Sequence, residues 1–247
     1  SHRKHSSTVG VTNFLPSFMG THLEKEIKAL EGVLNNPNKP VAAIIGGSKV
    51  STKIDVINFL LKKMDIIIIG GAMANTFVAA KGLDVGKSLF EKECIDLAKE
   101  LIEKSQNNNC NLILPTDFIV SKNLKKHAEY TTANFDSLPH NMMALDIGPK
   151  SIELINKNIN NCKTILWNGP LGAFETYPFD KGTNKVASHV SSLTKQKKIL
   201  SVAGGGDTVS ALNNAKVLND FSYVSTAGGA FLEWLEGKVL PGIEPIS

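Results

Sequence analysis

The amino-acid sequence predicts an α/β protein with an open three-layer parallel sheet and helices on both faces, of the Rossmann-like class. Two observations indicate this class. Apolar runs of strand length alternate along the chain with longer segments of helical period, and nearly continuous apolar strands joined through helices are typical of a parallel sheet buried on both faces. Five of these runs also end in small residues, mainly glycine, as strands often do at the carboxyl edge of such a sheet.

The first predicted element is a helix at residues 22–34 (HLEKEIKALEGVL), which has apolar residues at helical spacing and ends at the loop NNPNKP. Strands and helices then alternate, and their crossovers should be right-handed. The predicted strands are VAAIIGG (41–47), DIIIIGG (65–71), NLILP (111–115), TILWNGP (164–170), KILSVAGGG (198–206) and FSYVST (221–226). The predicted helices are KIDVINFLLKKM (53–64), AMANTFVAAKG (72–82), FEKECIDLAKELIEK (90–104), NKVASHVSSL (184–193), DTVSALNNA (207–215) and GGAFLEWLEGK (228–238).

The composition is that of a soluble globular protein. The 247 residues are 42% hydrophobic and 20% charged, with a net charge of +4. No dense block of lysine and arginine indicates nucleic acid as a partner, and no apolar run is long enough to cross a bilayer. The three cysteines form no C-x-x-C pair, which argues against a metal knuckle or a disulfide framework and favours a reducing, cytoplasmic compartment. The chain starts SHRKHSSTVG without an initiator methionine, so we expect a fragment of a longer protein.

The glycine-rich strand ends predict a ligand site. A tight turn explains one such end, but five ends would meet along one edge of a parallel sheet. Helix N-termini there favour anions, so the pattern predicts a nucleotide or another polyphosphate. The segment GLDVGKS (82–88) is one residue short of a Walker A loop and follows a helix, and no G-x-G-x-x-G fingerprint follows a strand. The five ends are IIGGSK, IIGGAM, LWNGPLG, VAGGGDT and VSTAGGA.

Two lysines and one aspartate could serve this ligand. Lys49 and Lys53 are four residues apart at the expected start of the helix after the first Gly-Gly turn. Two like charges at that spacing are unfavourable alone and become favourable when a phosphate binds, although the pair could also be two solvated lysines. Asp207 is expected at a helix N-terminus, where it could act as the N-cap. After the run Gly204–Gly206 it could instead hold Mg²⁺ together with substrate phosphates.

Together these segments resemble the phosphoglycerate kinase family. The resemblance implies a two-domain, hinge-bending kinase that interconverts 1,3-bisphosphoglycerate and ADP with 3-phosphoglycerate and ATP, and that acts as a monomer. This chain resembles its C-terminal, nucleotide-binding half, without the N-terminal domain. Residues 1–20 would be the end of that domain, 21–35 the interdomain helix, 36–240 the nucleotide-binding α/β domain, and 241–247 a tail that returns to the other domain. The matching segments, in the family's order, are SHRKHSSTVGV, GGSKVSTK, IIGGAMANTF, LDIGP, WNGPLGAFE, GGGDT and STAGGAFLEWLEGKVLPGI.

The resemblance also implies roles for individual residues. Lys49 would neutralise the transferring phosphoryl group, Lys53 would contact the nucleotide phosphates, and Asp207 would bind Mg²⁺, the expected cofactor. The other nucleotide-binding residues would be Gly47, Gly70, Gly71 and Leu145 at the adenine slot, Asn168, Pro170 and Glu175 at the phosphates, base or ribose, Gly206 and Thr208 at the phosphates, and Gly172 and Gly205 elsewhere in the site.

The transfer site itself would lie between the two domains. Gly206 and Gly229 would be catalytic together with the two lysines, since Gly228 and Gly229 open a helix whose amides point at the transfer site. Arg3 would bind phosphoglycerate. Ala72 and Ala227 stand where many relatives have a third glycine, which should narrow the pocket only slightly.

The chemistry of this reaction is compatible with these residues. In the ATP-consuming direction the acceptor is a carboxylate, which is already ionised near neutral pH, so no general base is required. The reaction needs in-line positioning and dense positive charge. Two other readings remain open: a stand-alone nucleotide-binding module, and a different α/β enzyme such as a dehydrogenase or a sugar-nucleotide transferase. We expect the chain alone to bind MgADP or MgATP and to have little or no kinase activity.

Overall fold

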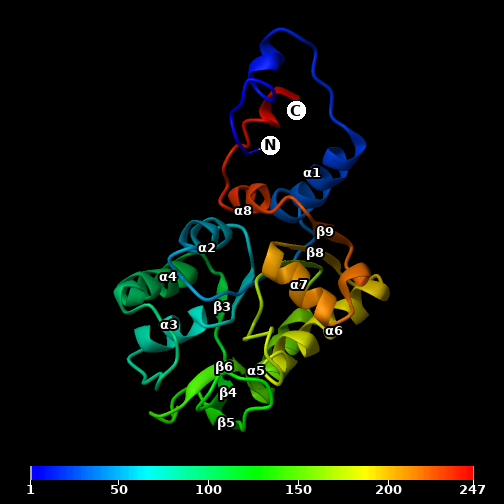
Figure 1. Cartoon of the computed structure of the whole chain (residues 1–247). Helices are drawn as coiled ribbons and strands as arrows, with labels where there is room; N and C mark the ends of the chain where they lie inside the picture. The colour runs from blue at the N-terminus through cyan, green and yellow to red at the C-terminus, as the bar shows by residue number, and fades with distance from the viewer. Residues whose placement is uncertain (1, 247) are drawn as a thin grey trace.

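The central feature of the fold is a parallel sheet of six strands, and Figure 1 shows the whole chain. The structure is a computed structural model that describes residues 2–246, so the first and last residues of the predicted terminal segments lie outside it. The sheet has the order β3-β2-β1-β7-β8-β9, and each neighbouring pair runs parallel. All of its strands were predicted from the sequence: β1 (Val41–Ile45), β2 (Ile66–Ile69), β3 (Asn111–Ile113), β7 (Thr164–Asn168), β8 (Leu200–Gly204) and β9 (Tyr223–Ser225).

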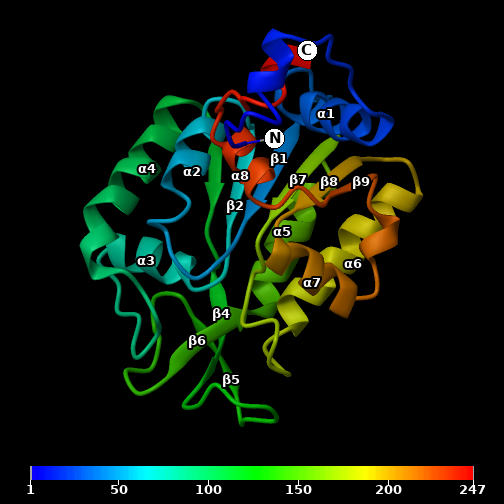
Figure 2. The same ribbon diagram turned by 45° about the horizontal axis from the view of Figure 1, so that its top comes forward.

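Helices cover both faces of this sheet, which confirms the predicted fold class. In strand β1 the residues Val41, Ala43 and Ile45 pack into one hydrophobic cluster, and Ala42 and Ile44 pack into the other. Figure 2 shows the two helical layers on either side of the sheet. One layer contains α1 (Thr21–Leu34), α2 (Ile54–Leu60), α3 (Met73–Ala80), α4 (Ile95–Asn107) and α8 (Gly229–Leu235); the other contains α5 (Pro149–Ile159), α6 (Lys181–Lys195) and α7 (Gly206–Asn214).

The predicted helices are confirmed with shifts of a few residues at their ends, whereas α5 was not predicted. Short 3₁₀ helices occur at η1 (Gly10–Asn13), η2 (Lys92–Cys94), η3 (Leu218–Asp220) and η4 (Glu244–Ile246). Within residues 2–246, no helix combines the length and the apolar character that crossing a membrane requires.

A second, antiparallel sheet was not predicted from the sequence. It has the order β5-β4-β6 and projects from the end of the molecule far from both termini (Figure 2). Its strands are β4 (Asp117–Ser121), β5 (Thr131–Asn134) and β6 (Met143–Ile147). β5 is largely exposed and polar, and β4 and β6 each contain a buried aspartate, so none of the three is a clean apolar run. The buried Asp117 carboxylate accepts hydrogen bonds from the first turn of α5, from the N–H groups of Lys150 (3.0 Å) and Ser151 (2.7 Å), which compensate for its loss of water.

Helix α1 confirms the helix predicted at residues 22–34 and is tied to the edge of the main sheet. The carboxylate of Glu26 is buried and accepts hydrogen bonds from the hydroxyl groups of Tyr223 and Ser225, both on β9. The N-terminal segment and the C-terminal tail lie close together beyond α1 and α8 in both views (Figures 1 and 2). Phe14 and Phe18 in the N-terminal segment are 85% and 88% exposed. The interdomain role of α1 and the assignment of the end segments to another domain stay predictions.

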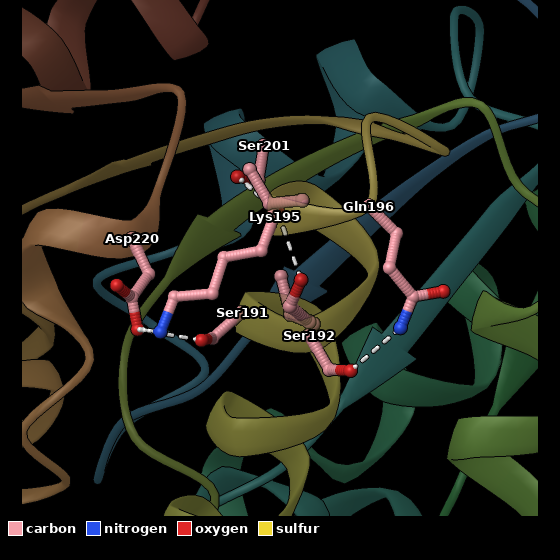
Figure 3. A network of polar contacts seen from close by, with 8 residues as sticks. Ser191, Ser192, Lys195, Gln196, Ser201 and Asp220 are labelled. Carbon is pink, nitrogen blue, oxygen red and sulfur yellow. Dashed lines mark hydrogen bonds and ion pairs between the residues drawn. The ribbon is translucent and has the colours of Figure 1, made fainter.

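A polar network connects the first residues of β8, at the amino ends of the parallel strands, to α6 and η3 (Figure 3). Ser201 on β8 shares a hydrogen bond with Thr194 on α6 (2.8 Å). One turn earlier on α6, Ser191 donates to Asp220 on η3 (2.7 Å), and Lys195 pairs with the same carboxylate (2.9 Å). The start of β8 is therefore fixed to α6, while its other end leads into the glycine run.

Candidate functional site

A cavity of about 350 Å³ lies at the carboxyl edge of the main sheet. This volume is within the usual range for small-molecule sites. Its walls include the loops after β1, β2 and β7, the first turn of α7, which follows β8, and strands β4 and β6 of the second sheet. The lining residues named in the sequence analysis are Gly47, Gly71, Ala72, Leu145, Pro170, Gly172, Glu175 and Asp207. The predicted convergence therefore holds for four of the five glycine-rich ends, and the loop after β9 does not line the cavity.

Three predicted site residues, Asn168, Thr208 and Gly70, do not line the cavity but make contacts that fix the loops around it. The amide of Asn168, only 2% exposed, donates to the carbonyl of Gly204 (2.7 Å). The Thr208 hydroxyl is also buried and accepts a hydrogen bond from the Gly169 N–H (2.7 Å). Gly70 is packed so closely that an added Cβ would lie 2.3 Å from Leu171. These contacts join the ends of β7 and β8 and fix the loops on which the lining residues are carried.

Lys53 is the cation that the fold brings to this region. It is the N-cap residue of α2 and is only half-exposed, and its Nζ donates a hydrogen bond to the side-chain oxygen of Asn168. Burial lowers the pKa of Lys53, while the negative charges of Asp207 and Glu236 act in the opposite direction. Desolvation of an ammonium group is costly, the nearby carboxylates offset part of that cost, and a phosphate oxygen would be a further favourable partner for it.

The prediction that Lys49 lies at the start of the helix was wrong. α2 begins at Ile54, and Lys49 is an exposed residue in the preceding loop. The reason is local: the Lys53 N–H closes a turn by donating to the Val50 carbonyl (2.8 Å), and Ser51 is held by a glutamate from elsewhere in the chain. Among the contacts within residues 2–246, none joins Lys49 to Asp207. Lys53 thus interacts electrostatically with Asp207, and Lys49 is exposed on the loop next to the cavity-lining Ser48.

The three consecutive glycines Gly204–Gly206, where β8 ends and α7 begins, lie in three different environments. An added Cβ on Gly204 would lie 2.7 Å from the ring of Phe231, and one on Gly205 would lie 2.6 Å from the amide nitrogen of Asn168. Gly205 also has a φ of 97°, which side-chain-bearing residues rarely adopt. At Gly206 an added Cβ would meet nothing within 4 Å. The packed fold therefore explains Gly204 and Gly205, and Gly206 faces open space at the start of α7.

The N-cap role considered for Asp207 was wrong. The N-cap of α7 is Gly205, whose positive φ starts the helix one residue before the predicted position. Asp207 is the second residue of the helix, and its exposed carboxylate makes no capping hydrogen bond. A carboxylate in the first turn interacts favourably with the helix dipole, and here it also remains accessible to a ligand.

The different environments of Gly205 and Gly206 lead to a testable contrast. Gly205→Ala should lower the free energy of unfolding by about 1–3 kcal/mol, because it forces a strained backbone and a clash with Asn168. Gly206→Ala should leave the melting temperature unchanged or slightly higher, because alanine favours a helix, but it should weaken nucleotide binding by narrowing the approach to the α7 amides. Thermal melts and calorimetric titration measure the two effects. Equal destabilisation by both substitutions would contradict this interpretation.

The remaining predicted residues lie outside the cavity, near the chain's N-terminal segment. Gly228 is the N-cap of α8 with a φ of 56°, and both it and Gly229 are exposed. An added Cβ on Gly229 would lie 3.5 Å from the Nε2 atom of His2, so the N-terminal residues lie against the start of α8. Arg3 is exposed next to His2.

Sequence reasoning missed Asp146, a buried carboxylate in the cavity wall. It is 3% exposed and accepts hydrogen bonds from the N–H groups of Gly182 (2.6 Å) and Ile147 (2.9 Å). Burial raises the pKa of Asp146 to about 8, and the negative charge of Asp180 adds to this rise, although the two hydrogen bonds oppose it. An aspartate between apolar residues in LDIGP was the available signal. The other lining residues that had no predicted role are Ser48, Asn75, Leu89, Phe118, Leu124, Met143, Ala144, Leu171, Ala173, Phe174 and Thr176.

The pKa of Asp146 predicts a specific pH dependence of stability. Because the pKa in the folded protein is raised above the unfolded value of 3.8, the folded state binds more protons between pH 4 and 8, and its stability falls as the pH rises through this window. Asp146→Asn removes this dependence, so the stability difference between wild type and variant should shrink from pH 5 to pH 8. Urea unfolding at several pH values tests this, and two parallel pH profiles would contradict it.

Comparisons with known proteins identify the relatives of this chain. The family model described as phosphoglycerate kinase matches residues 1–238. The phosphoglycerate kinases of Rhizobium meliloti (strain 1021) and Brucella melitensis biotype 1 are 51% and 53% identical over 244 residues, which is 99% of this chain and 61% and 62% of theirs. The chain thus spans about 61% of the length of the curated relatives it matches.

Solved structures agree with these matches. The structure of phosphoglycerate kinase from Coxiella burnetii superimposes with a TM-score of 0.95 at 44% identity, over 99% of this chain and 62% of that one. The crystal structure of the enzyme from Pyrococcus horikoshii OT3 gives a TM-score of 0.82 at 29% identity, over 99% of this chain and 61% of that one.

Proposed function

Because the chain belongs to the phosphoglycerate kinase family, we propose that it carries the nucleotide site of that enzyme, where MgADP and MgATP bind. The reaction would be the reversible transfer of a phosphoryl group from 1,3-bisphosphoglycerate to ADP. One observation carries this proposal: the cavity is walled by four glycine-rich strand ends and includes Asp207, which interacts electrostatically with Lys53. Such a combination of backbone amides, a lysine and a carboxylate suits a magnesium-bound polyphosphate.

The apolar part of the cavity would hold the adenosine. Leu145 and Phe174 line it together with Ala72, which supplies a small residue where a bulkier one would narrow the slot. Glu175 is exposed and lines the same cavity, so its carboxylate could accept hydrogen bonds from ribose hydroxyl groups. The phosphates would then extend toward Asp207.

The phosphate end would be formed by the start of α7 and by Lys53. The open space at Gly206 lets phosphate oxygens approach the first N–H groups of the helix. Lys53 can exchange its hydrogen bond with Asn168 for one to a phosphate oxygen. A phosphate oxygen would carry negative charge, whereas the present acceptor of the Lys53 bond is a neutral amide, so the exchange would join two charged groups.

The residues present fit Mg²⁺. Within residues 2–246, no cluster of three or more His, Cys, Asp or Glu side chains could hold a metal by itself. Mg²⁺ is often bound by one carboxylate together with substrate phosphates and waters, and the exposed carboxylate of Asp207 meets that requirement. When bound, the ion would neutralise charge on the phosphate oxygens.

The transfer step would use charge and position rather than a general base. Lys49 and the amides at Gly228 and Gly229 would stabilise the phosphoryl group as it moves, because its charge is spread over three equatorial oxygens. The acceptor in the ATP-consuming direction is a carboxylate that is already ionised. Arg3, residues 21–35 and the tail at 241–247 would belong to the connection with a phosphoglycerate-binding half. We propose a cytoplasmic monomer.

The experiment that tests this proposal is calorimetric titration of the 247-residue chain with MgADP, repeated with NAD⁺. Saturable binding of MgADP without binding of NAD⁺ is the expected result. Binding of NAD⁺ in preference to MgADP would favour a dehydrogenase instead. A coupled assay should detect little or no ATP formation from 1,3-bisphosphoglycerate. Robust turnover by the chain alone would contradict the proposal that phosphoglycerate is bound by a separate half of the enzyme.

A further inference from the structure

We infer that Glu91 is a positioning residue for phosphoryl transfer, whose carboxylate holds the loop of residues 46–53 in the shape that presents Lys49. This loop is called the lysine loop below. The inference rests on the proposed function, because Lys49 acquires its importance from the transferring phosphoryl group. Glu91 lies just before η2 and received no role from the sequence.

Both oxygens of the Glu91 carboxylate bind one residue in the middle of the lysine loop. The N–H of Ser51 donates to Oε2 (3.0 Å), and the hydroxyl of Ser51 donates to Oε1 (2.5 Å). A two-point contact fixes the orientation of the loop as well as its distance from Glu91. The two residues are 40 positions apart, so the contact forms through the tertiary fold.

Glu91 is itself held in place from the other side. Its backbone N–H donates to the hydroxyl of Thr76 (3.1 Å), and Thr76 is a fully buried residue of α3. The loop is therefore connected through Glu91 to a buried helix of the domain.

The charges around Glu91 agree with an ionised carboxylate. Partial burial acts to raise the pKa of Glu91, but hydrogen bonds from Ser51 and Val50 and the positive charge of Lys49 lower it below its usual value. An ionised carboxylate is therefore present at neutral pH, where it accepts the Ser51 bonds and attracts Lys49.

The position of the loop explains why this contact matters for function. At one end Gly47 lines the cavity, and at the other Lys53 caps α2 and binds Asn168. Lys49 lies between these fixed ends on exposed backbone. Misplacement of a catalytic group by about 1 Å can cost about a hundredfold in rate, so a long, flexible lysine benefits from a fixed backbone.

The test compares Glu91→Gln with wild type by calorimetric titration of the 247-residue chain. Two ligands are used: MgADP, and the Mg²⁺ complex of the β,γ-imido analogue of ATP, which adds the terminal phosphate proposed to contact Lys49. Glu91→Gln should weaken binding of the ATP analogue by about fivefold more than binding of MgADP, as expected for the loss of one well-placed interaction. Glu93→Gln, an exposed glutamate two residues later, is the matched control and should bind both ligands like wild type.

A purely structural role would give a different result. If Glu91→Gln weakens both ligands equally, or leaves both unchanged while wild type binds them, this inference is overturned and the proposed function stands. If wild type binds neither nucleotide, the proposed function fails and the inference with it.

Ser51→Ala provides a second variant in case Glu91→Gln does not fold. It removes the hydroxyl donor and keeps the backbone N–H. It should therefore weaken binding of the ATP analogue relative to MgADP, by less than Glu91→Gln does. Adding Glu91→Gln to Ser51→Ala should give less than the sum of the two effects, because both act on one contact. A wild-type ratio of the two affinities, for the ATP analogue and for MgADP, in Ser51→Ala would also overturn the inference.

Discussion

Replacing Lys49 with alanine is expected to lower kcat by about a hundred- to a thousandfold, which is the typical cost of removing one preorganised donor at a developing charge. The measurement requires a two-domain enzyme that includes this chain. The melting temperature should not change, because the Lys49 side chain is exposed on a loop. A fall in kcat without a fall in stability would separate a catalytic role from a structural one.

The matched control for this prediction is Lys62→Ala, which removes an exposed lysine just beyond the end of α2. It changes the net charge by the same amount and should leave kcat unchanged. Near-normal turnover in Lys49→Ala would remove this residue from its assigned role. An equal loss in both variants would indicate a general effect of positive charge.

Replacing Asp207 with asparagine is expected to weaken MgADP binding by about ten- to a hundredfold, in line with the loss of an interaction between charged groups. Binding of ADP without Mg²⁺ should stay the same or become tighter, because the substitution removes a negative charge beside the phosphates. Titrations with MgCl₂ and with EDTA distinguish the two cases. The structural cost should be small, since Asp207 makes no capping hydrogen bond and its interaction with the helix dipole contributes about 0.3–1 kcal/mol.

Asp55→Asn is the corresponding control. Asp55 is an exposed acidic residue in the first turn of α2, as Asp207 is in the first turn of α7. Its replacement should leave the Mg²⁺ dependence of ADP binding intact. If Asp207→Asn keeps wild-type affinity for MgADP, the metal is held elsewhere.

The main sheet could be predicted because its strands are apolar on both faces. Every residue of β1 (VAAII) is buried, and the alternation of its side chains between two clusters requires a helical layer on each side. The second sheet could not be predicted in the same way. Asp117 and Asp146 interrupt its strands, and their burial depends on N–H groups from later parts of the chain that the local sequence does not reveal.

The candidate site shows the same division. The glycine-rich ends and Asp207 could be located from the sequence, because parallel strands bring their carboxyl ends to one edge. The conformation of the lysine loop could not, since Glu91 determines it from 40 residues away. Nor could a run of three glycines show which residue serves packing and which leaves space for a ligand, because Phe231 and Asn168 approach it only in the folded chain.

The cavity walls are contributed by residues from 47 to 207. Nearly the whole length of the α/β domain must therefore be folded before these residues come together. Contacts of such long sequence separation form late and slowly during folding. Nucleotide affinity should therefore appear only once the chain has completed its tertiary structure. A nucleotide present during refolding would trap that final state by mass action, and would protect the native chain against proteolysis to a degree set by its concentration.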